Sequence, residues 1–337
     1  MKLSFERANY KIINQTQKNR IDKFIENHGG LVFHETLFNE ILSGFIKSDL
    51  YYHFAYRENN LVGICPVHKT QKGLLKKYES GKLDFEIPYG GLVFSNETEL
   101  PELMSLFKPG PFEAFNYFSN ILINNNTILT TDAYIYWTSI INLDTALEEI
   151  WKINIDSKRR NMIRKAQKIG IKINICGSEV INDFYSLLKE MNISTGMKSK
   201  GIEFYKQLIS CYPAEKARIM LAYKDNDLLS GIFLLGNKNV IHYWQGASHW
   251  NAGNYGQGEL LQWEAIKWSS RMGVQYYDLC YLYSNKQLEE KEKKQMRIAD
   301  FKLGFSKELM PFYLISKRSY SFKILNKIQN TLRYYRR

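Results

Sequence analysis

The sequence predicts an α/β (α+β) protein of two similar domains, each a twisted mixed sheet flanked by helices. Three observations predict this fold class. The chain has 337 residues, which is long for one small domain and suits two of ordinary size. A hairpin-like segment occurs once in each half. In the second half this segment is followed by a strand, a loop, a helix and another strand, an order typical of an α/β layer.

The repeated segment begins at Phe54 and again at Leu221, an offset of 167 residues. The copies read FAYRENNLVGI and LAYKDNDLLSGI, so each has an apolar strand, a charged Asx-rich turn and a second apolar strand. The glycine of the second copy is offset by one residue more, and Ser230 is interpreted as an insertion. Hairpins also resemble one another by chance, but this offset divides the chain into near-equal halves, which favours a duplication.

The first half is less regular than the second. We expect a helix over 37–45 before the hairpin and a Gly-rich turn at 88–91 before a strand over 92–94. A helix over 112–123 and a strand over 133–141 follow. A basic helix over 156–168 then connects the halves. These elements predict a first domain over 1–150 and a second over 151–316.

The second half has clear boundaries. A strand is predicted over 240–245, and a polar loop over 247–256 follows it. The next segment, 257–272, has apolar residues near helical spacing and ends at Gly273, so a helix is predicted there. A last strand is predicted over 274–281.

Gly256 and Gly258 stand between the predicted strand and the start of this helix. Glycine lets the backbone approach a ligand closely, and the free N–H groups and dipole of a helix start favour an anion. The pyrophosphate of coenzyme A suits such a site. A flexible loop before a helix is the structural alternative.

Residues 240–273 resemble the core of the GNAT acyltransferases, whose fourth strand holds the acyl thioester and whose next helix starts under the pyrophosphate. Four segments resemble the Fem-type proteins, tandem GNAT-domain enzymes that transfer aminoacyl groups from tRNA to peptidoglycan precursors. These segments are SKRRNMIRKA from Ser157, QGAS from Gln245, YDL from Tyr277 and FKLGF from Phe301. In the Fem-type fold the tail returns to the first domain, so we expect residues 317–337 to complete it.

The resemblance implies an acyl-donor site in the second domain, with CoA as co-substrate. The residues expected to contact the donor are Gln245, Gly246, Ala247, Ser248, Gly256, Gln257 and Gly258. Backbone N–H groups at the end of the strand over 240–245 are expected to stabilise the oxyanion. Asp278 and His242 are candidate bases, and Tyr281 is a candidate acid. Each also suits a structural role, as a loop cap, a core histidine or a packed aromatic residue.

The acceptor is expected in the first domain and the cleft, in contact with Tyr89 and His34. Arg159 and Arg164, in the basic segment, are candidate phosphate ligands, although a solvated helix explains them equally well. The tail from Lys317 is basic and free of acids. It fits either a membrane-surface helix or, as the simpler account, packing on the first domain. The charged run EEKEKK from Glu289 suits a lid or a solvated loop.

The formal charge of +12 is compatible with nucleic acids, anionic lipids or phosphorylated small molecules. No apolar run reaches the ~20 residues of a membrane span, and no secretory signal is recognised. The four cysteines are scattered without metal-ligand spacing, so we expect a cytoplasmic protein with reduced thiols and no metal. The oligomeric state is left open.

These features lead to three hypotheses about function. The first is an acyl-CoA-dependent N-acyltransferase acting on a nucleotide-linked (dTDP) amino sugar of lipopolysaccharide or another surface polysaccharide, as in FdhC-type enzymes. The second is a Fem-type aminoacyl-tRNA-dependent transferase acting on a peptidoglycan precursor, with tRNA as partner. The third is a catalytically silent module that binds tRNA or phospholipid. The paired glycines before the helix, and the lack of a long helical arm found in some Fem enzymes, favour the first.

Overall fold

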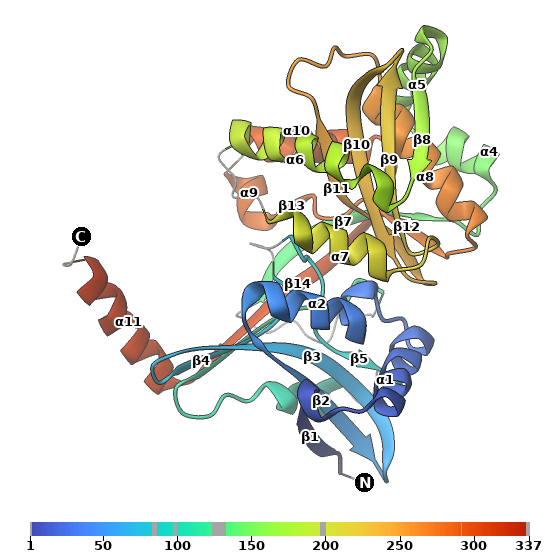
Figure 1. The fold of residues 1–337 in the computed structure, drawn as a ribbon. Coiled ribbons are helices and arrows are strands. Elements are labelled where there is room, and N and C mark those ends of the chain that lie inside the picture. Colours follow the sequence, from blue (N-terminus) through green and yellow to red (C-terminus); the bar gives the residue numbers. More distant parts are fainter. Residues whose placement is uncertain are drawn as a thin grey trace. The chain divides into compact units, whose positions relative to one another are not determined.

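The computed structural model describes residues 2–82, 86–96, 100–122, 133–195, 200–290 and 292–334. The chain divides into two compact units (Figure 1), one of Met1–Tyr136 with Pro311–Arg337 and one of Trp137–Met310. We expected boundaries near 150 and 316, whereas the division falls within the strands β7 (Ala133–Asn142) and β14 (Leu309–Arg318). In the part of the chain listed above, no helix is long and apolar enough to cross a membrane.

The first unit is built on a sheet with strand order β1-β2-β3-β4-β6-β14. Neighbours are antiparallel except β4 and β6, which are parallel, and the short β5 also pairs with β3. The elements are β1 (Ser4–Asn9), η1 (Tyr10–Ile12), α1 (Gln15–Asn27), η2 (Val32–His34), α2 (Thr36–Ile46), β2 (Asp49–Arg57), β3 (Asn60–Lys72), β4 (Leu75–Ser80), β5 (Val93–Phe94), α3 (Leu100–Leu103), η5 (Met104–Phe107), β6 (Glu113–Phe118), β14 and α11 (Tyr320–Tyr334).

Apolar side chains alternate along the strands of the first unit, so each face of the sheet has its own core. On one face, Ile21 and Ile25 of α1 pack with Tyr52 and Phe54 of β2. On the other, Phe107 packs with Val67 and Phe115.

The helix predicted over 112–123 is wrong, since Glu113–Phe118 form the strand β6 (residue 123 lies outside the described ranges). The segment EAFNYF is rich in aromatic residues, which favour strands. One of its two partners, β14, lies about 200 residues further along the chain. The helix predicted over 37–45 and the strands over 92–94 and 133–141 are confirmed as α2, β5 and β7.

The second unit has strand order β7-β12-β11-β10-β9-β8, in which only β11 and β12 are parallel to each other. Its elements after β7 are α4 (Leu147–Glu149), the π-helix η7 (Ile150–Asn154), α5 (Ser157–Ile169), β8 (Lys172–Cys176), η8 (Ser178–Val180), α6 (Ile181–Thr195), α7 (Ile202–Cys211), β9 (Ala217–Lys224), β10 (Asp227–Gly236), β11 (Val240–Ser248), α8 (Gln257–Arg271), β12 (Tyr276–Asp278), β13 (Tyr283–Ser284), which pairs with β7, α9 (Asn285–Glu289) and α10 (Lys293–Leu303).

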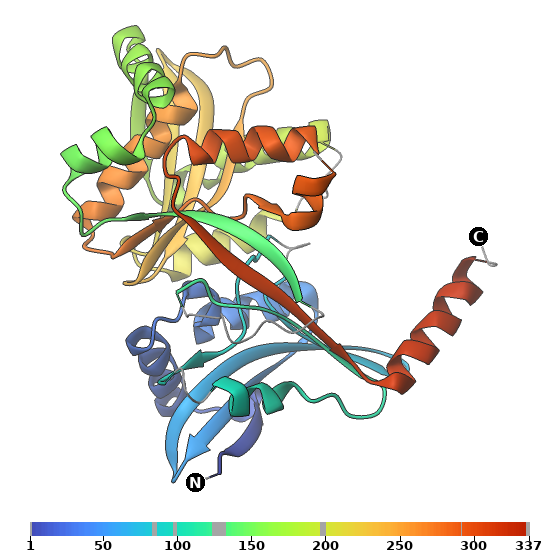
Figure 2. The same ribbon diagram turned by 180° about the vertical axis from the view of Figure 1, so that it is seen from behind.

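Helices cover both faces of this second sheet. Figure 2 shows α5 (green) and α8 (orange) on one side, where Ile163 and Leu261 join the main core cluster. On the other side, Phe184 of α6 and Tyr205 of α7 make ring contacts with Phe233 of β10. The predicted helices 156–168 and 257–272 and strand 240–245 are confirmed, whereas the last strand, β12, is shorter than predicted. Part of the EEKEKK run begins α10 rather than forming a loop.

Both predicted hairpins are present, as β2–β3 and β9–β10. Each has a one-residue β-bulge just after its turn, at Val62 and at Leu229. The two bulges are separated by the same offset as the two segments, so no residue is inserted, and Ser230 stands where the first hairpin has Gly63. The interpretation of Ser230 as an insertion is therefore wrong. The turn and the bulge fix the register in both hairpins. The glycine of the second hairpin, Gly231, lies one position later than Gly63 does in the first.

Candidate active site

The second unit contains a cavity of about 300 Å³ that brings together many of the predicted donor residues. Gly246, Ala247 and Ser248 of β11 and Gly258 of α8 line it. The other lining residues are Met191, Ser230, Gly231, Ile232, Tyr243, Leu261, Gln262 and Phe301. Every one of these side chains is uncharged at neutral pH. Gln245 does not line the cavity, and its side chain is buried.

The edge of β11 explains why a ligand can reach this cavity. β11 and β12 pair only over Val240–His242 and Tyr276–Asp278. Beyond His242, β11 stays paired with β10 on one side but has left β12 on the other. The strands thus diverge just before Gly246, Ala247 and Ser248, which line the cavity.

Tyr243 and Gly246 shape the wall on the β11 side. A β-carbon at Gly246 would overlap the hydroxyl group of Tyr243, so a larger residue here would displace the Tyr243 ring. Burial raises the pKa of Tyr243 to about 12. Its hydroxyl group therefore stays protonated at neutral pH and can donate a hydrogen bond to a ligand.

Ser230 places a hydroxyl group in the same wall. The residue is 1% exposed, and its Oγ has no hydrogen-bond partner within the described ranges. Buried hydroxyl groups are normally paired, so an unpaired one in a cavity wall is a contact point for a polar ligand group. The predictions from sequence did not include Ser230 among the site residues.

Lys302 of α10 is a second site residue that the predictions missed. Its ammonium group lies 5.4 Å from the centre of the Tyr243 ring and donates to the carbonyl oxygen of Tyr281 at 3.0 Å. Burial lowers the pKa of Lys302, against the opposite effects of Cys280 and Asp278. Among the described residues no carboxylate lies within ion-pair distance of it. The signal was a lysine within the apolar FKLGF segment, quoted above only for its resemblance.

Asp278 and His242 are buried behind the cavity wall, each with 0% exposure. The carboxylate of Asp278 accepts hydrogen bonds from Thr138 Oγ1 at 2.5 Å, from His242 Nδ1 at 2.7 Å and from the N–H of Cys280 at 2.9 Å. Burial alone would raise the pKa of Asp278, but these partners, His242 foremost, hold it below its ordinary value. The arrangement ties β7, β11 and β12 together, which is a positioning role.

Tyr281 and the thiol of Cys280 complete this region. Instead of pointing a free hydroxyl group at a ligand, Tyr281 donates to the amide oxygen of Gln287. Ligand atoms of His242, Asp278 and Cys280 lie within 4.8 Å of one another, a spacing compatible with a metal ion. The Cys280 thiol, whose pKa is raised well above its ordinary value by burial, donates a hydrogen bond to Asp278 at 3.4 Å. The hydrogen bonds to Asp278 account for the cluster.

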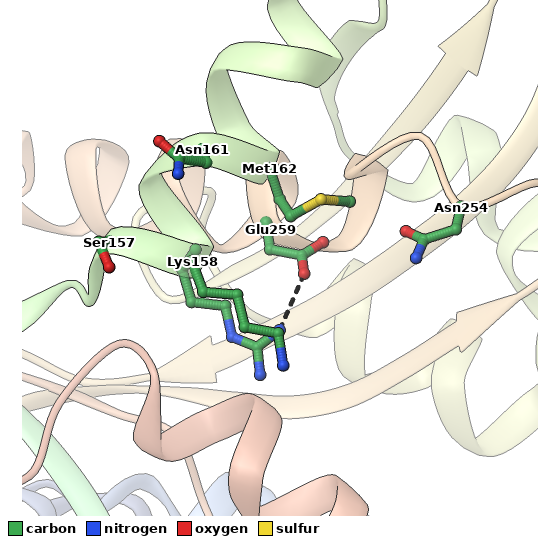
Figure 3. Close-up of a pocket in the computed structure, with 7 residues that line it drawn as sticks. Ser157, Lys158, Asn161, Met162, Asn254 and Glu259 are labelled. Carbon is green, nitrogen blue, oxygen red and sulfur yellow. Dashed lines mark hydrogen bonds and ion pairs between the residues drawn. The ribbon is translucent and has the colours of Figure 1, made fainter.

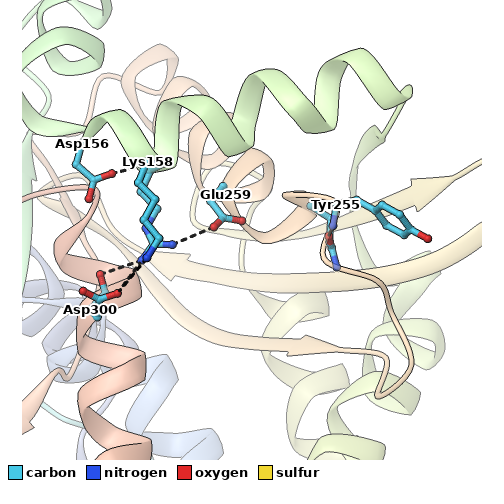
Figure 4. A network of polar contacts seen from close by, with 7 residues as sticks. Asp156, Lys158, Tyr255, Glu259 and Asp300 are labelled. Carbon is cyan, nitrogen blue, oxygen red and sulfur yellow. Dashed lines mark hydrogen bonds and ion pairs between the residues drawn. The ribbon is translucent and has the colours of Figure 1, made fainter.

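In place of the substrate contact predicted for it, Arg159 has an internal role. Its side chain is 8% exposed and forms ion pairs with Glu259 of α8 at 3.0 Å and Asp300 of α10 at 3.3 Å. Both of these acidic partners are labelled in Figure 4. Arg159 therefore links α5 to α8 and α10. The cations of α5 that remain exposed are Lys158, Arg164, Lys165 and Lys168.

The start of α8 fits the diphosphate of CoA poorly. A cavity of about 560 Å³ lies here, and Lys158, Met162, Asn254 and Glu259 are among its lining residues (Figure 3). The largely buried carboxylate of Glu259 occupies the first turn of α8, where an anion would otherwise meet the helix dipole. Gly256 has a φ of 84° because its backbone packs on the carbonyl group of Met162, which makes its glycine a packing requirement rather than a phosphate contact. Gln257 bonds within its own loop, to the N–H of Tyr255 and the carbonyl oxygen of Gly253.

His34 and Tyr89, the predicted acceptor contacts, lie in the core of the first unit with 0% exposure. His34 Nε2 is 2.9 Å from the carbonyl oxygen of Gly90, and His34 Nδ1 accepts from the N–H of Leu31. Tyr89 packs edge-on against Phe312. Both side chains therefore hold the Gly-rich turn in place rather than face a ligand.

Comparisons with known proteins give the family resemblance. The model of the FemAB family matches residues 125–228. The aminoacyltransferase FemB of Staphylococcus epidermidis is 24% identical over 123 residues, and the UDP-N-acetylmuramoylpentapeptide-lysine N(6)-alanyltransferase of Weissella viridescens is 24% identical over 125 residues. Each match covers 36% of this chain, with 27% of FemB and 37% of the alanyltransferase. The chain thus spans about a third of these relatives.

Solved structures match over nearly the whole chain. The crystal structure of FemX has a TM-score of 0.66 at 14% identity, covering 91% of this chain and 96% of FemX. The C-terminal domain of a putative lysylphosphatidylglycerol synthetase from Agrobacterium fabrum has a TM-score of 0.58 at 11% identity, covering 94% and 96%. At these identities the likeness shows the fold alone.

These findings overturn the first functional hypothesis. The named relatives in sequence are aminoacyltransferases, one of them acting on the lysine of a UDP-linked muramoyl pentapeptide, and neither name refers to acyl-CoA or to acylation of a sugar amine. The prediction of an N-acyltransferase for a nucleotide-linked amino sugar is therefore wrong, and the aminoacyl-transfer alternative is better supported. The predicted α/β fold class, with two units that are each a mixed sheet flanked by helices, is confirmed, and the predicted resemblance to the Fem-type proteins is confirmed with it.

Proposed function

We propose that this protein is a Fem-type aminoacyltransferase that moves an aminoacyl group from tRNA to an amine of a peptidoglycan precursor. The names of the relatives support the reaction class. The observation that carries the proposal is Lys302, a partly desolvated cation beside an uncharged cavity and the opened edge of β11.

In this reaction the acceptor amine attacks the carbonyl carbon of the aminoacyl ester. A C–N bond forms, the C–O bond to the ribose breaks, and the amine proton passes to the released hydroxyl group. Negative charge develops on the carbonyl oxygen at the tetrahedral stage. Preorganised donors aimed at that oxygen lower the barrier, and each one typically contributes about 10²- to 10³-fold in rate.

Two groups supply such donors here. Lys302 carries a positive charge with no described carboxylate within ion-pair distance, and the Tyr243 hydroxyl group stays protonated. The uncharged cavity between β11 and α8 takes the aminoacyl group, with Ser230 as a hydrogen-bonding point.

A dedicated base has no place in this scheme. Asp278 is buried and already accepts bonds from Thr138, His242 and Cys280, so it cannot reach an acceptor amine. We therefore assign rate enhancement to orientation of a neutral amine and to stabilisation of the oxyanion.

The test is a transfer assay with the purified full chain. The donor is tRNA charged with radiolabelled alanine, serine or glycine, and the acceptor is UDP-N-acetylmuramoyl pentapeptide. We expect label on the acceptor lysine and none when the tRNA is treated with base, which hydrolyses the ester, before the assay. Transfer from acetyl-CoA with none from any charged tRNA would contradict the proposal.

A further inference from the structure

Helix α11 (Tyr320–Tyr334) has two apolar faces, and the first unit covers one of them. Phe322 is 2% exposed and packs with Leu75 and Ala114, and Leu325 joins the same cluster. Ile328, by contrast, does not belong to this covered cluster.

The outer face carries a second apolar stripe. Tyr320, Ile324 and Ile328 recur every fourth residue, the spacing that places side chains on one face of a helix. They are 79%, 45% and 49% exposed. Isolated exposed apolar residues are common, but a stripe along one helix face is typical of an interaction surface.

Cations flank this stripe. Lys323 and Lys327 are exposed and lie one position before Ile324 and Ile328, along the same edge of the helix. The chain from Lys317 onward contains no Asp or Glu. A helix with an apolar stripe bordered by Lys and free of acids matches the boundary between headgroups and acyl chains of an anionic membrane. A nucleic acid would contact the lysines but leave the isoleucines exposed to water. A second copy of the helix would be repelled, because both stripes are bordered by positive charges.

We infer that the outer face of α11 binds the surface of an anionic lipid bilayer. Ile324 and Ile328 enter the headgroup region, and Lys323 and Lys327 pair with lipid phosphates. The helix lies on the membrane rather than crossing it. This inference goes beyond the proposed function, since none of these residues belongs to the cavity or to its surroundings.

The experiment is co-sedimentation of the full chain with vesicles. One set contains equal parts of phosphatidylglycerol and phosphatidylcholine, and the other contains phosphatidylcholine alone. We expect binding to the first set that weakens from 50 to 300 mM NaCl, and little binding to the second. Ile324→Ser with Ile328→Ser, and separately Lys323→Gln with Lys327→Gln, should each reduce the partition coefficient at least about tenfold.

Matched variants in the second unit provide the control. Ile153→Ser with Ile193→Ser removes two isoleucines that are each 72% exposed, and Lys293→Gln with Lys294→Gln removes two exposed charges. Both should bind vesicles like the parent. Melting curves verify folding, and the single substitutions Ile324→Ser and Ile328→Ser replace any double variant that melts early.

Three outcomes would overturn the inference. The parent fails to bind the anionic vesicles, the matched variants lose as much binding as the α11 variants, or the α11 variants lose a dimer or tRNA binding while keeping vesicle binding. Transfer to the water-soluble acceptor should be the same in all these variants. A failure of membrane binding is thereby separated from a failure of the proposed activity.

Discussion

Lys302 and Asp278 are both ionised in largely desolvated surroundings, but their neighbours differ. Asp278 has a full set of donors around its carboxylate. Lys302 has one backbone acceptor and an aromatic ring, and no described carboxylate. A charge with all its partners stabilises the structure, whereas a charge with spare donors can act on a ligand. Their substitutions should therefore affect different measurements.

Lys302→Met should reduce kcat for aminoacyl transfer by about 10²- to 10³-fold, because a donor to the oxyanion is lost. The KM for the charged tRNA should change little, since the contact strengthens only in the transition state. Lys302→Arg, which keeps the charge, should recover part of the rate. Steady-state kinetics with both variants tests this, and a methionine variant with at least half the parental kcat would remove Lys302 from the mechanism.

Asp278→Asn should act on stability first. A buried pair broken on one side typically costs about 3–5 kcal/mol, so the free energy of unfolding in urea should fall by that order. The pKa of Asp278 is lower in the folded chain than its usual value of about 3.9. The carboxylate therefore stabilises the fold above that value, and its contribution is lost as pH falls through the folded pKa. The difference in the free energy of unfolding between parent and variant should be largest above about pH 5 and should become smaller towards pH 3. A difference that does not depend on pH would show that the variant loses packing rather than a charge interaction.

At the scale of elements, the two glycines at the start of α8 have different roles, one in packing and one in the cavity. Gly256 is fixed by contact with Met162 of α5, whereas Gly258 faces the cavity. A β-carbon at Gly258 would meet only the ring of Phe301, at 3.7 Å, which is ordinary van der Waals contact. Side chains can thus be added at Gly258 without disturbing the helix.

Gly258→Val should raise the KM for the aminoacyl donor by about tenfold, because the side chain fills space that the aminoacyl group needs. The KM for the acceptor and the melting temperature should stay close to the parental values. Gly44→Val is the matched control, since Gly44 lies on the exposed side of α2 with no atom within 4 Å of its added β-carbon. Equal effects of the two substitutions on the donor KM would show that the cavity does not hold the donor.

For the whole molecule, local patterns were enough to predict both hairpins, the order β11, α8, β12 and the family resemblance, but not the environment of single side chains. Helical spacing located α8, and the repeated turn located both hairpins. The strand β6 was missed because one of its partners lies some 200 residues away. His34, Tyr89 and Arg159 are polar in sequence and buried in the fold, since their partners come from distant segments. Lys302 drew no attention because only the folded chain shows that no described carboxylate lies within ion-pair distance of it.

The net charge of +12 leads to a prediction at this scale. If the exposed cations of α5 contact tRNA, kcat/KM for the charged tRNA should fall roughly 10- to 100-fold between 50 and 200 mM KCl, because counterions are released on binding. Arg164→Gln with Lys168→Gln should reduce the slope of log(kcat/KM) against log[KCl] by about 0.7 to 0.9 per charge. The matched pair Lys293→Gln with Lys294→Gln should leave the slope unchanged. Equal slopes for the two double variants would show that tRNA does not contact α5.

The position of β14 has a consequence for synthesis on the ribosome. The second unit is one continuous stretch, Trp137–Met310, whereas the sheet of the first unit includes β14, most of which is synthesised after the whole second unit. During synthesis β6 cannot pair with β14 until β14 has been made. Until then the edge of β6 and the apolar residues beside that edge lack their final partner. The usual order, in which the amino-terminal part of a protein matures first, is thereby reversed. We therefore expect chaperones to bind newly made chains mainly at the first unit, until the residues of β14 have left the ribosome.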